Sequence, residues 1–175
     1  MKKSLYRLTC AAILAALSIV LNVFFRTIIP NDLFGIPLFA LPLIIGSILL
    51  GPFYGGVMGL TVDVISFSLI GTGNFLFLFT LSRIVWGALP GLFYLNTNLK
   101  SKKIVLVLGI FLTHVTVTGL NTLALFIHFN SGAFATLPLR IIMVTPNVVF
   151  LSFMTNLIME RLPKEYLVDL GFNKI

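Results

Sequence analysis

A single arginine, Arg83, lies in the middle of the apolar stretch FLFTLSRIVWGALPG at residues 77–91. A guanidinium stays charged at physiological pH, and a charge inside an apolar segment is costly unless it is paired or hydrated. The residue therefore predicts either an ion pair or a polar cavity. Asp63 is the candidate partner, because it precedes the turn GTGN at residues 71–74 by about as many residues as Arg83 follows it.

Arginines outnumber acids toward the end of the apolar segments at which the turn of residues 71–74 lies. Arg26 closes the first segment and Arg140 opens the last, whereas Asp63 and Asp32 are the acids expected at the same level. At least one positive charge is therefore left over. Because the planar fork of arginine suits carboxylates, the surplus predicts a pocket for an anionic ligand.

Further polar side chains are expected at a comparable depth. His114, Thr118 and Asn121 fall near one another on a helical wheel, and Asn147 follows Arg140 by seven residues, which is two turns along one helix face. Both stripes could line one cavity. The alternative for each residue is a hydrogen bond between helices that has no ligand role.

Trp86 follows Arg83 by three residues and therefore lies on a neighbouring face of the same helix. If it lines the pocket, it offers a stacking surface for a flat ring. The alternative is an aromatic side chain in the protein core or in lipid. Likewise, a structural salt bridge between Asp63 and Arg83 would leave neither residue for a ligand.

The sequence does not favour an enzyme, a metal or a cofactor. His114 and His128 are fourteen residues apart and the lone cysteine, Cys10, lies in another segment, so no ligand cluster for a metal is expected. The chain contains neither a nucleophile-elbow motif nor a GxxxxGK[ST] phosphate-binding loop. Any active transport would need energy from another subunit or an ion.

These residues must be positioned by membrane-spanning helices. Hydrophobic residues make up 58% of the 175 residues, charged residues 10%, and the mean hydropathy is +1.09. Apolar stretches recur along the whole chain, which predicts an all-α integral membrane protein with one domain over residues 1–175. The six-helix bundle that we expect has its helices at about 6–25, 37–50, 54–70, 75–95, 104–128 and 137–160.

The second of these helices is expected to be short or kinked, because Pro37 and Pro42 interrupt it. Five or six spans therefore remain open at this point. The positive-inside rule gives the orientation. With both termini cytoplasmic, the inner side receives nine of the twelve basic residues, namely Lys2, Lys3, Arg7, Lys100, Lys102, Lys103, Arg161, Lys164 and Lys174.

Small residues recur at helical spacing in two segments. In CAAILAAL, Ala11 pairs with Ala15 and Ala12 with Ala16 at intervals of four, a spacing that lets two helices approach closely in lipid. They pack either against the chain's own helices or against an external partner. The stretch GPFYGGVMGLTVD at residues 51–63 places three glycines and the acid at the same interval.

These motifs resemble those of the substrate-binding S components of energy-coupling factor (ECF) vitamin transporters. The resemblance rests on AAILAAL in a first helix with basic flanks, on LLGPFYGGVMGLTVD, and on WGALPGLFY before a basic inner loop. It covers nearly the whole chain. Within the family, Arg26, the helix with Arg83, and LPLRIIMVTPNVV at residues 137–149 are most similar to the folate-specific group.

The resemblance implies a multi-pass protein of the bacterial cell membrane that captures a vitamin from outside. It also implies docking through Ala11, Ala12, Ala15 and Ala16 onto a transmembrane coupling subunit that carries two cytoplasmic ATPases. Surplus arginine then favours folate, whose glutamate tail has two carboxylates. We expect Arg26 or Arg140 at the tail.

The candidates for the ring end are Asp63, Arg83, Trp86, His114, Asn121 and Asn147. Another anionic vitamin, biotin or pantothenate, is the alternative within the family. A membrane scaffold protein without a ligand is the alternative outside it.

Overall fold

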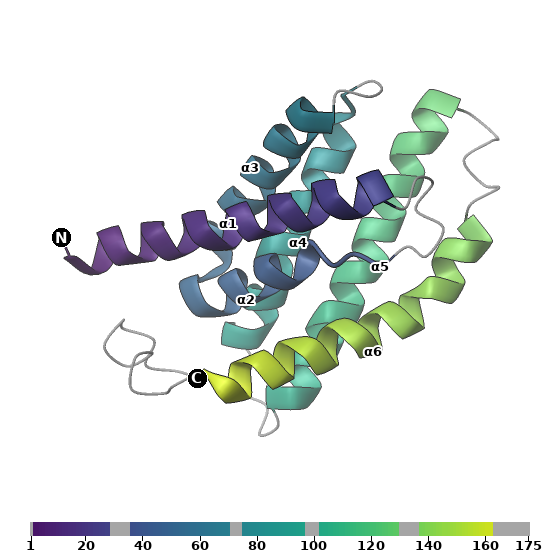
Figure 1. The fold of residues 1–175 in the computed structure, drawn as a ribbon. Helices are drawn as coiled ribbons and strands as arrows, with labels where there is room; N and C mark the ends of the chain where they lie inside the picture. Colours follow the sequence, from purple (N-terminus) through teal and green to yellow (C-terminus); the bar gives the residue numbers. More distant parts are fainter. Residues whose placement is uncertain (1, 29–35, 71–74, 97–101, 130–136, 163–175) are drawn as a thin grey trace.

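The computed structural model describes residues 2–28, 36–70, 75–96, 102–129 and 137–162, and these form a bundle of α-helices (Figure 1). Each predicted helix is present, and its ends lie within about one turn of the predicted ends. In chain order the helices are α1 (Lys2–Ile28), α2 (Ala40–Leu50), α3 (Pro52–Ile70), α4 (Phe77–Asn96), α5 (Lys102–Phe129) and α6 (Leu137–Arg161).

Five of the described helices are long and apolar enough to cross a membrane, and α2 is the shorter one. With 11 residues, α2 rises only about 16 Å, roughly half of a bilayer's hydrocarbon thickness. The two prolines do not interrupt the helix as predicted. Pro37 precedes it, and Pro42 lies in its first turn, where a missing N–H breaks no helical hydrogen bond. The helix ends at Leu50, and the next residue, Gly51, has a φ of +100° that favours glycine and turns the chain into α3.

The centre of the bundle is α2, whose residues are mostly buried, with Leu43 and Ile44 fully enclosed. It packs against α1, α3, α4 and α6. In Figure 1, α1 lies across the side of the bundle formed by α2 and α3, and α6 runs obliquely past α5. A short helix thus holds together four longer ones.

The closest helix pair is α3 with α4. A methyl group added at Gly55 would overlap the carbonyl oxygen of Gly87, and one added at Gly59 would overlap that of Arg83. Glycine is therefore required at these positions for the two backbones to approach. The predicted glycine face of α3 packs against α4, one turn before Asp63.

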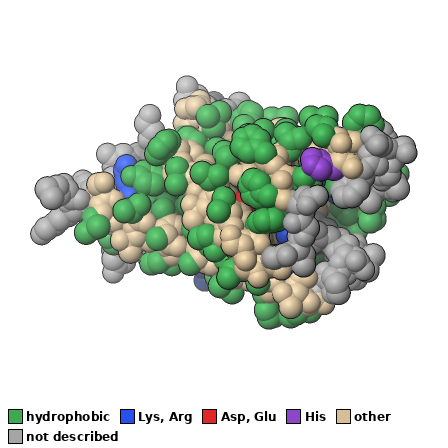
Figure 2. Space-filling model, turned by 90° about the horizontal axis from the view of Figure 1, so that it is seen from above, with side chains coloured by type: hydrophobic (Ala, Val, Ile, Leu, Met, Phe, Trp, Pro, Cys, Tyr) green, Lys and Arg blue, Asp and Glu red, His purple; other side chains and the backbone are tan. Residues whose placement is uncertain are grey.

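The outer faces of the helices are apolar. Among the described residues seen in Figure 2, hydrophobic side chains are spread over the surface and few charged ones are visible. On α1, Ile13, Val20 and Phe24 are exposed, and on α6, Ile142 and Val149 are exposed. Such a surface is expected of helices that face lipid, and not of a protein surrounded by water.

Candidate functional site

The guanidinium of Arg83 on α4 is the meeting point of three other segments. Its Nε lies 3.7 Å from Oδ1 of Asp63 on α3, and its Nη2 donates a 3.2 Å hydrogen bond to Oδ1 of Asn22 on α1. The ring of Phe39, just before α2, lies over it, with 3.5 Å between Cζ and the ring centroid. The charge inside the apolar segment is therefore compensated by an acid, an amide and an aromatic face.

Asp63 and Arg83 lie at the same level because α3 and α4 are antiparallel and packed through glycine. Gly59 contacts the backbone of Arg83, and Asp63 follows Gly59 by one turn on α3. The prediction that these two residues lie at similar depth is confirmed by the contact between them. Their side chains are only 14% and 16% exposed, so both are largely removed from the surface.

Asp63 has a shorter contact with a neutral group. Its Oδ2 accepts a 2.6 Å hydrogen bond from the Thr80 hydroxyl. The 3.7 Å separation from Arg83 exceeds hydrogen-bond distance, so the two charges attract without sharing a proton. The carboxylate is thus fixed by Thr80 and faces the cation at a distance that leaves room for rearrangement.

A second polar cluster joins α4, α5 and α6. Trp86 meets His114 edge to face, with ring centroids 5.4 Å apart. Nδ2 of Asn147 lies 3.1 Å from Nε2 of His114, and the other ring nitrogen, Nδ1, lies 3.3 Å from the Thr118 hydroxyl. Trp86, His114 and Asn147 are all buried. The structure therefore brings three of the predicted site residues into direct contact.

Ser82 extends this cluster toward Arg83. Its hydroxyl donates a 2.7 Å hydrogen bond to Oδ1 of Asn121 on α5. Ser82 precedes Trp86 by one turn of α4, and Asn121 follows His114 by two turns of α5, so both pairs lie along one α4–α5 interface. Arg83 is the next residue after Ser82. The two clusters are consequently adjacent on α4.

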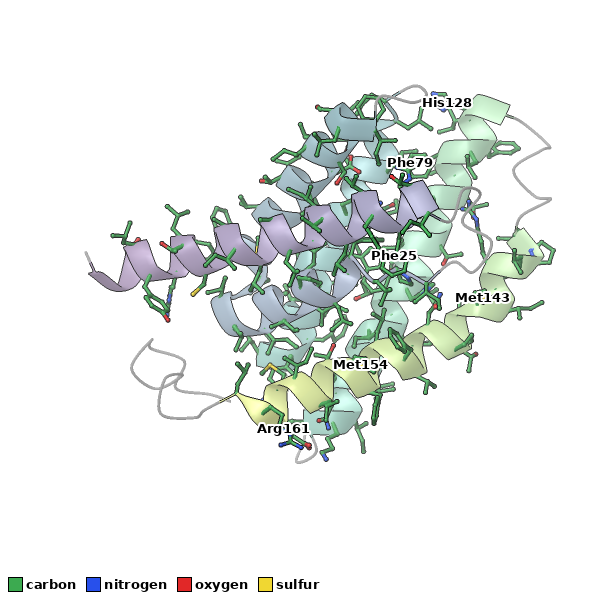
Figure 3. All side chains as sticks on the ribbon, in the orientation of Figure 1. Phe25, Phe79, His128, Met143, Met154 and Arg161 are labelled. Atoms are coloured by element: carbon green, nitrogen blue, oxygen red, sulfur yellow. The ribbon has the colours of Figure 1, made fainter. Side chains whose placement is uncertain are left out.

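The other two arginines predicted for the site, Arg26 and Arg140, lie toward helix ends. Arg26 is exposed in the last turn of α1, one turn beyond Asn22, and Arg140 is half-buried in the first turn of α6. Asp32, which was expected to share this level, lies outside the described residues. In Figure 3, His128 on α5 and Arg161 on α6 mark opposite ends of the bundle, and α1 ends and α6 begins away from the Arg161 end.

The alanines of α1 divide into two faces. Ala11 and Ala15 are buried against the chain's own helices, whereas Ala12 and Ala16 are exposed. The alternative of packing within the chain is therefore confirmed for Ala11 and Ala15. Docking on a partner through this helix stays a prediction, and the exposed pair is the part of the stripe that another protein can reach.

Four residues of these clusters were not among the predicted site residues: Asn22, Phe39, Thr80 and Ser82. Asn22 carries the clearest signal, because it is an amide within the apolar run of α1, four residues before Arg26. Phe39 is one of seventeen phenylalanines and could not be singled out. Among the described residues, no three His, Cys, Asp or Glu side chains are placed to hold a metal ion.

Comparison with known proteins places the chain in a family. The family model for the substrate-specific component of ECF transporters matches residues 6–168. The folate transporter FolT of Clostridium novyi (strain NT) is 30% identical over 83 residues, which are 47% of this chain and 48% of that protein.

The match thus spans about half the length of this curated relative. No solved structure matches. The family is a component of transporters and not a class of enzymes. The family match covers most of the helices described above and confirms the resemblance drawn from the sequence: this chain belongs to the substrate-specific components of ECF transporters.

Proposed function

We propose that this protein is the folate-binding subunit of an ECF-type importer in the bacterial cell membrane. It captures folate from outside, with both termini on the cytoplasmic side, and delivers it through a transmembrane coupling subunit with two ATPases. The similarity to a folate transporter carries the choice of folate. The composition of the sequence supports it, since the three arginines Arg26, Arg83 and Arg140 outnumber the acids, Asp63 and Asp32, that are predicted at the same level.

The chemistry of folate matches the two kinds of site that the helices offer. Its glutamate tail has two carboxylates, for which guanidiniums are the best partners, and Arg26 and Arg140 lie near helix ends where a tail can reach them. Its flat pterin ring combines hydrogen-bond donors and acceptors with a stacking face. Asn121, Asn147 and His114 supply polar groups for the ring edge, and Trp86 supplies an aromatic surface.

Asp63 and Arg83 divide the roles at the ring end. A carboxylate accepts two hydrogen bonds from an amino group and a neighbouring ring N–H, which is the pattern of the pterin edge. In this assignment Thr80 holds one oxygen of Asp63 in place, and the 3.7 Å contact to Arg83 loosens when the pterin arrives. Arg83 then donates to the ring carbonyl.

The exposed half of the alanine stripe fits the coupling subunit. Ala12 and Ala16 lie one turn apart on the lipid-facing side of α1. Small residues at this spacing allow close packing of a partner helix inside the membrane, where van der Waals contact provides much of the association energy. The buried pair, Ala11 and Ala15, then sets how closely α1 packs within this chain.

The decisive experiment is binding of vitamins to the purified protein in detergent. Calorimetry or thermal shift is measured with folate, biotin, pantothenate, riboflavin and thiamine. Folate is expected to bind and to raise the melting temperature, because a ligand that binds only the folded state stabilises it by mass action.

Each other outcome has a distinct meaning. Binding of biotin or pantothenate in place of folate would keep the family role and change the substrate. No shift with any vitamin would favour a scaffold without a ligand and would contradict the proposal.

A further inference from the structure

Helix α1 contributes two polar side chains that are fully enclosed by the bundle. Ser18 is 0% exposed and Asn22 is 5% exposed. They lie one turn apart and therefore on the same face of α1. A buried polar group within a membrane helix is costly unless it is hydrogen-bonded. The hydrogen-bond partners of Ser18 and Asn22 therefore indicate the role of these two side chains.

Both hydrogen-bond partners, Phe39 and Arg83, lie at the guanidinium of Arg83. The Ser18 hydroxyl donates a 2.6 Å hydrogen bond to the backbone carbonyl of Phe39, and Oδ1 of Asn22 accepts a 3.2 Å hydrogen bond from Nη2 of Arg83. Phe39 in turn lies over Arg83, 3.5 Å from ring centroid to Cζ. We call Ser18, Asn22, Phe39 and Arg83 the α1 clamp.

The clamp fixes Arg83 in two independent ways. The hydrogen bond to Asn22 sets the rotation of the guanidinium plane, because Nη2 must point at α1 while Nε points at Asp63 on α3. The Phe39 ring sets its tilt by covering one face. A long side chain with many rotamers is thereby held in one orientation before any ligand arrives, which lowers the entropic cost of binding.

We propose that Asn22, supported by Ser18, is a positioning residue of the vitamin site that acts through Arg83 and Phe39. This inference rests on the proposed function. It makes α1 part of the ligand site as well as the helix that carries the exposed alanines. The ligand group concerned is an oxygen with negative charge or carbonyl character, the group that a guanidinium binds best.

The test measures folate affinity by calorimetry and by the fluorescence of Trp86, the single tryptophan of the chain. Asn22→Leu keeps the branching and the number of heavy atoms of the side chain and removes the amide. We expect it to weaken folate binding about tenfold, the usual cost of losing a hydrogen bond to a charged group. Thr9→Val is the matched control on α1, because Thr9 is exposed and bonds only its own helix backbone.

A double-mutant cycle separates positioning from general damage. In an Arg83→Gln background, Asn22→Leu is expected to change affinity less than about twofold, because its route to the ligand has been removed. Ser18→Ala, which acts through Phe39, is expected to weaken binding by less than Asn22→Leu does. Equal losses from Asn22→Leu in both backgrounds would overturn the proposal, and so would wild-type affinity in the single variant.

A conservative variant covers the case in which Asn22→Leu does not fold. Asn22→Asp retains the contact and adds a charge that pairs with Arg83, so the melting temperature of the ligand-free protein is expected to hold or rise. Folate affinity is expected to fall, because the guanidinium is neutralised. Parallel changes in stability and affinity would reject the positioning role, whereas a wild-type protein that binds no vitamin would contradict the proposed function itself.

Discussion

Asp63 and Arg83 face each other across the α3–α4 interface at 3.7 Å, while Asp63 makes its shorter contact, 2.6 Å, with the Thr80 hydroxyl. The acid is thus oriented by a neutral group and the cation by Asn22. Their attraction is Coulombic, without the added strength of a direct hydrogen bond. A ligand group that takes the place of Arg83 beside Asp63, or of Asp63 beside Arg83, therefore has only this weak contact to replace.

The charge balance at this pair leads to the first prediction. Asp63→Asn removes the carboxylate that faces Arg83, and Arg83→Gln removes the cation that faces Asp63. Each is expected to lower the free energy of unfolding by about 1 to 3 kcal/mol, while the double variant loses less than the sum. Thermal unfolding of the ligand-free protein in detergent checks this, and strictly additive losses would show that the charges do not interact.

Helix packing gives the second prediction. Gly87→Ala places a methyl group against the carbonyl oxygen of Gly55, so α3 and α4 must separate. The expected cost is about 1 to 3 kcal/mol, the usual range for overpacking. The matched control is Gly119→Ala on α5, where the added methyl group meets nothing within 4 Å.

The control should leave stability unchanged or raise it by about 1 kcal/mol, since alanine favours helix more than glycine does. Melting temperatures of the two variants are compared directly. Similar behaviour of both would mean that α3 and α4 tolerate a wider separation.

The two faces of α1 give the third prediction. Ala12→Trp and Ala16→Trp add bulk on the exposed face, so folding and vitamin binding are expected to persist while uptake by cells is lost. Ala11→Trp adds the same bulk inside the bundle, where Ala11 is 7% exposed, and is expected to destabilise the protein.

Uptake of labelled folate and the yield of folded protein are measured side by side. Normal uptake by both exposed-face variants would exclude this face as the docking surface.

The helix-end arginines give the fourth prediction. Arg26→Ala and Arg140→Ala are each expected to weaken the free energy of folate binding by about 2 to 5 kcal/mol, the cost of breaking a desolvated pair between arginine and a tail carboxylate. The affinity of a pterin without the glutamate tail is expected to change much less. Calorimetry with both ligands tests the assignment. An equal loss for the two ligands would show that these arginines do not contact the tail.

The sequence predicts the helices well because lipid imposes a simple constraint on them. A segment that crosses the bilayer must be apolar, helical and about 20 residues long, so α1, α3, α4, α5 and α6 follow from hydropathy alone. The pairing of Asp63 with Arg83 could also be predicted from the sequence. It needs only two antiparallel helices and a count of residues from the turn between them.

The contacts between helices that are distant in sequence could not be predicted in the same way. Asn22 meets Arg83 only because α1 lies across α2 and α3, a crossing that no local pattern encodes. Phe39 gave no signal among so many phenylalanines. The division of the alanines into a buried and an exposed pair likewise depends on which face of α1 meets the bundle, which hydropathy does not specify when both faces are apolar.

The enclosure of α2 has a consequence for how the protein responds to its membrane. The five long helices must match the thickness of the bilayer and tilt when it changes. Helix α2 is surrounded by protein and too short to span, so bilayer thickness acts on it only through its neighbours. Phe39, which directly precedes α2, is therefore expected to keep its position relative to α2 across membranes of different lipid composition.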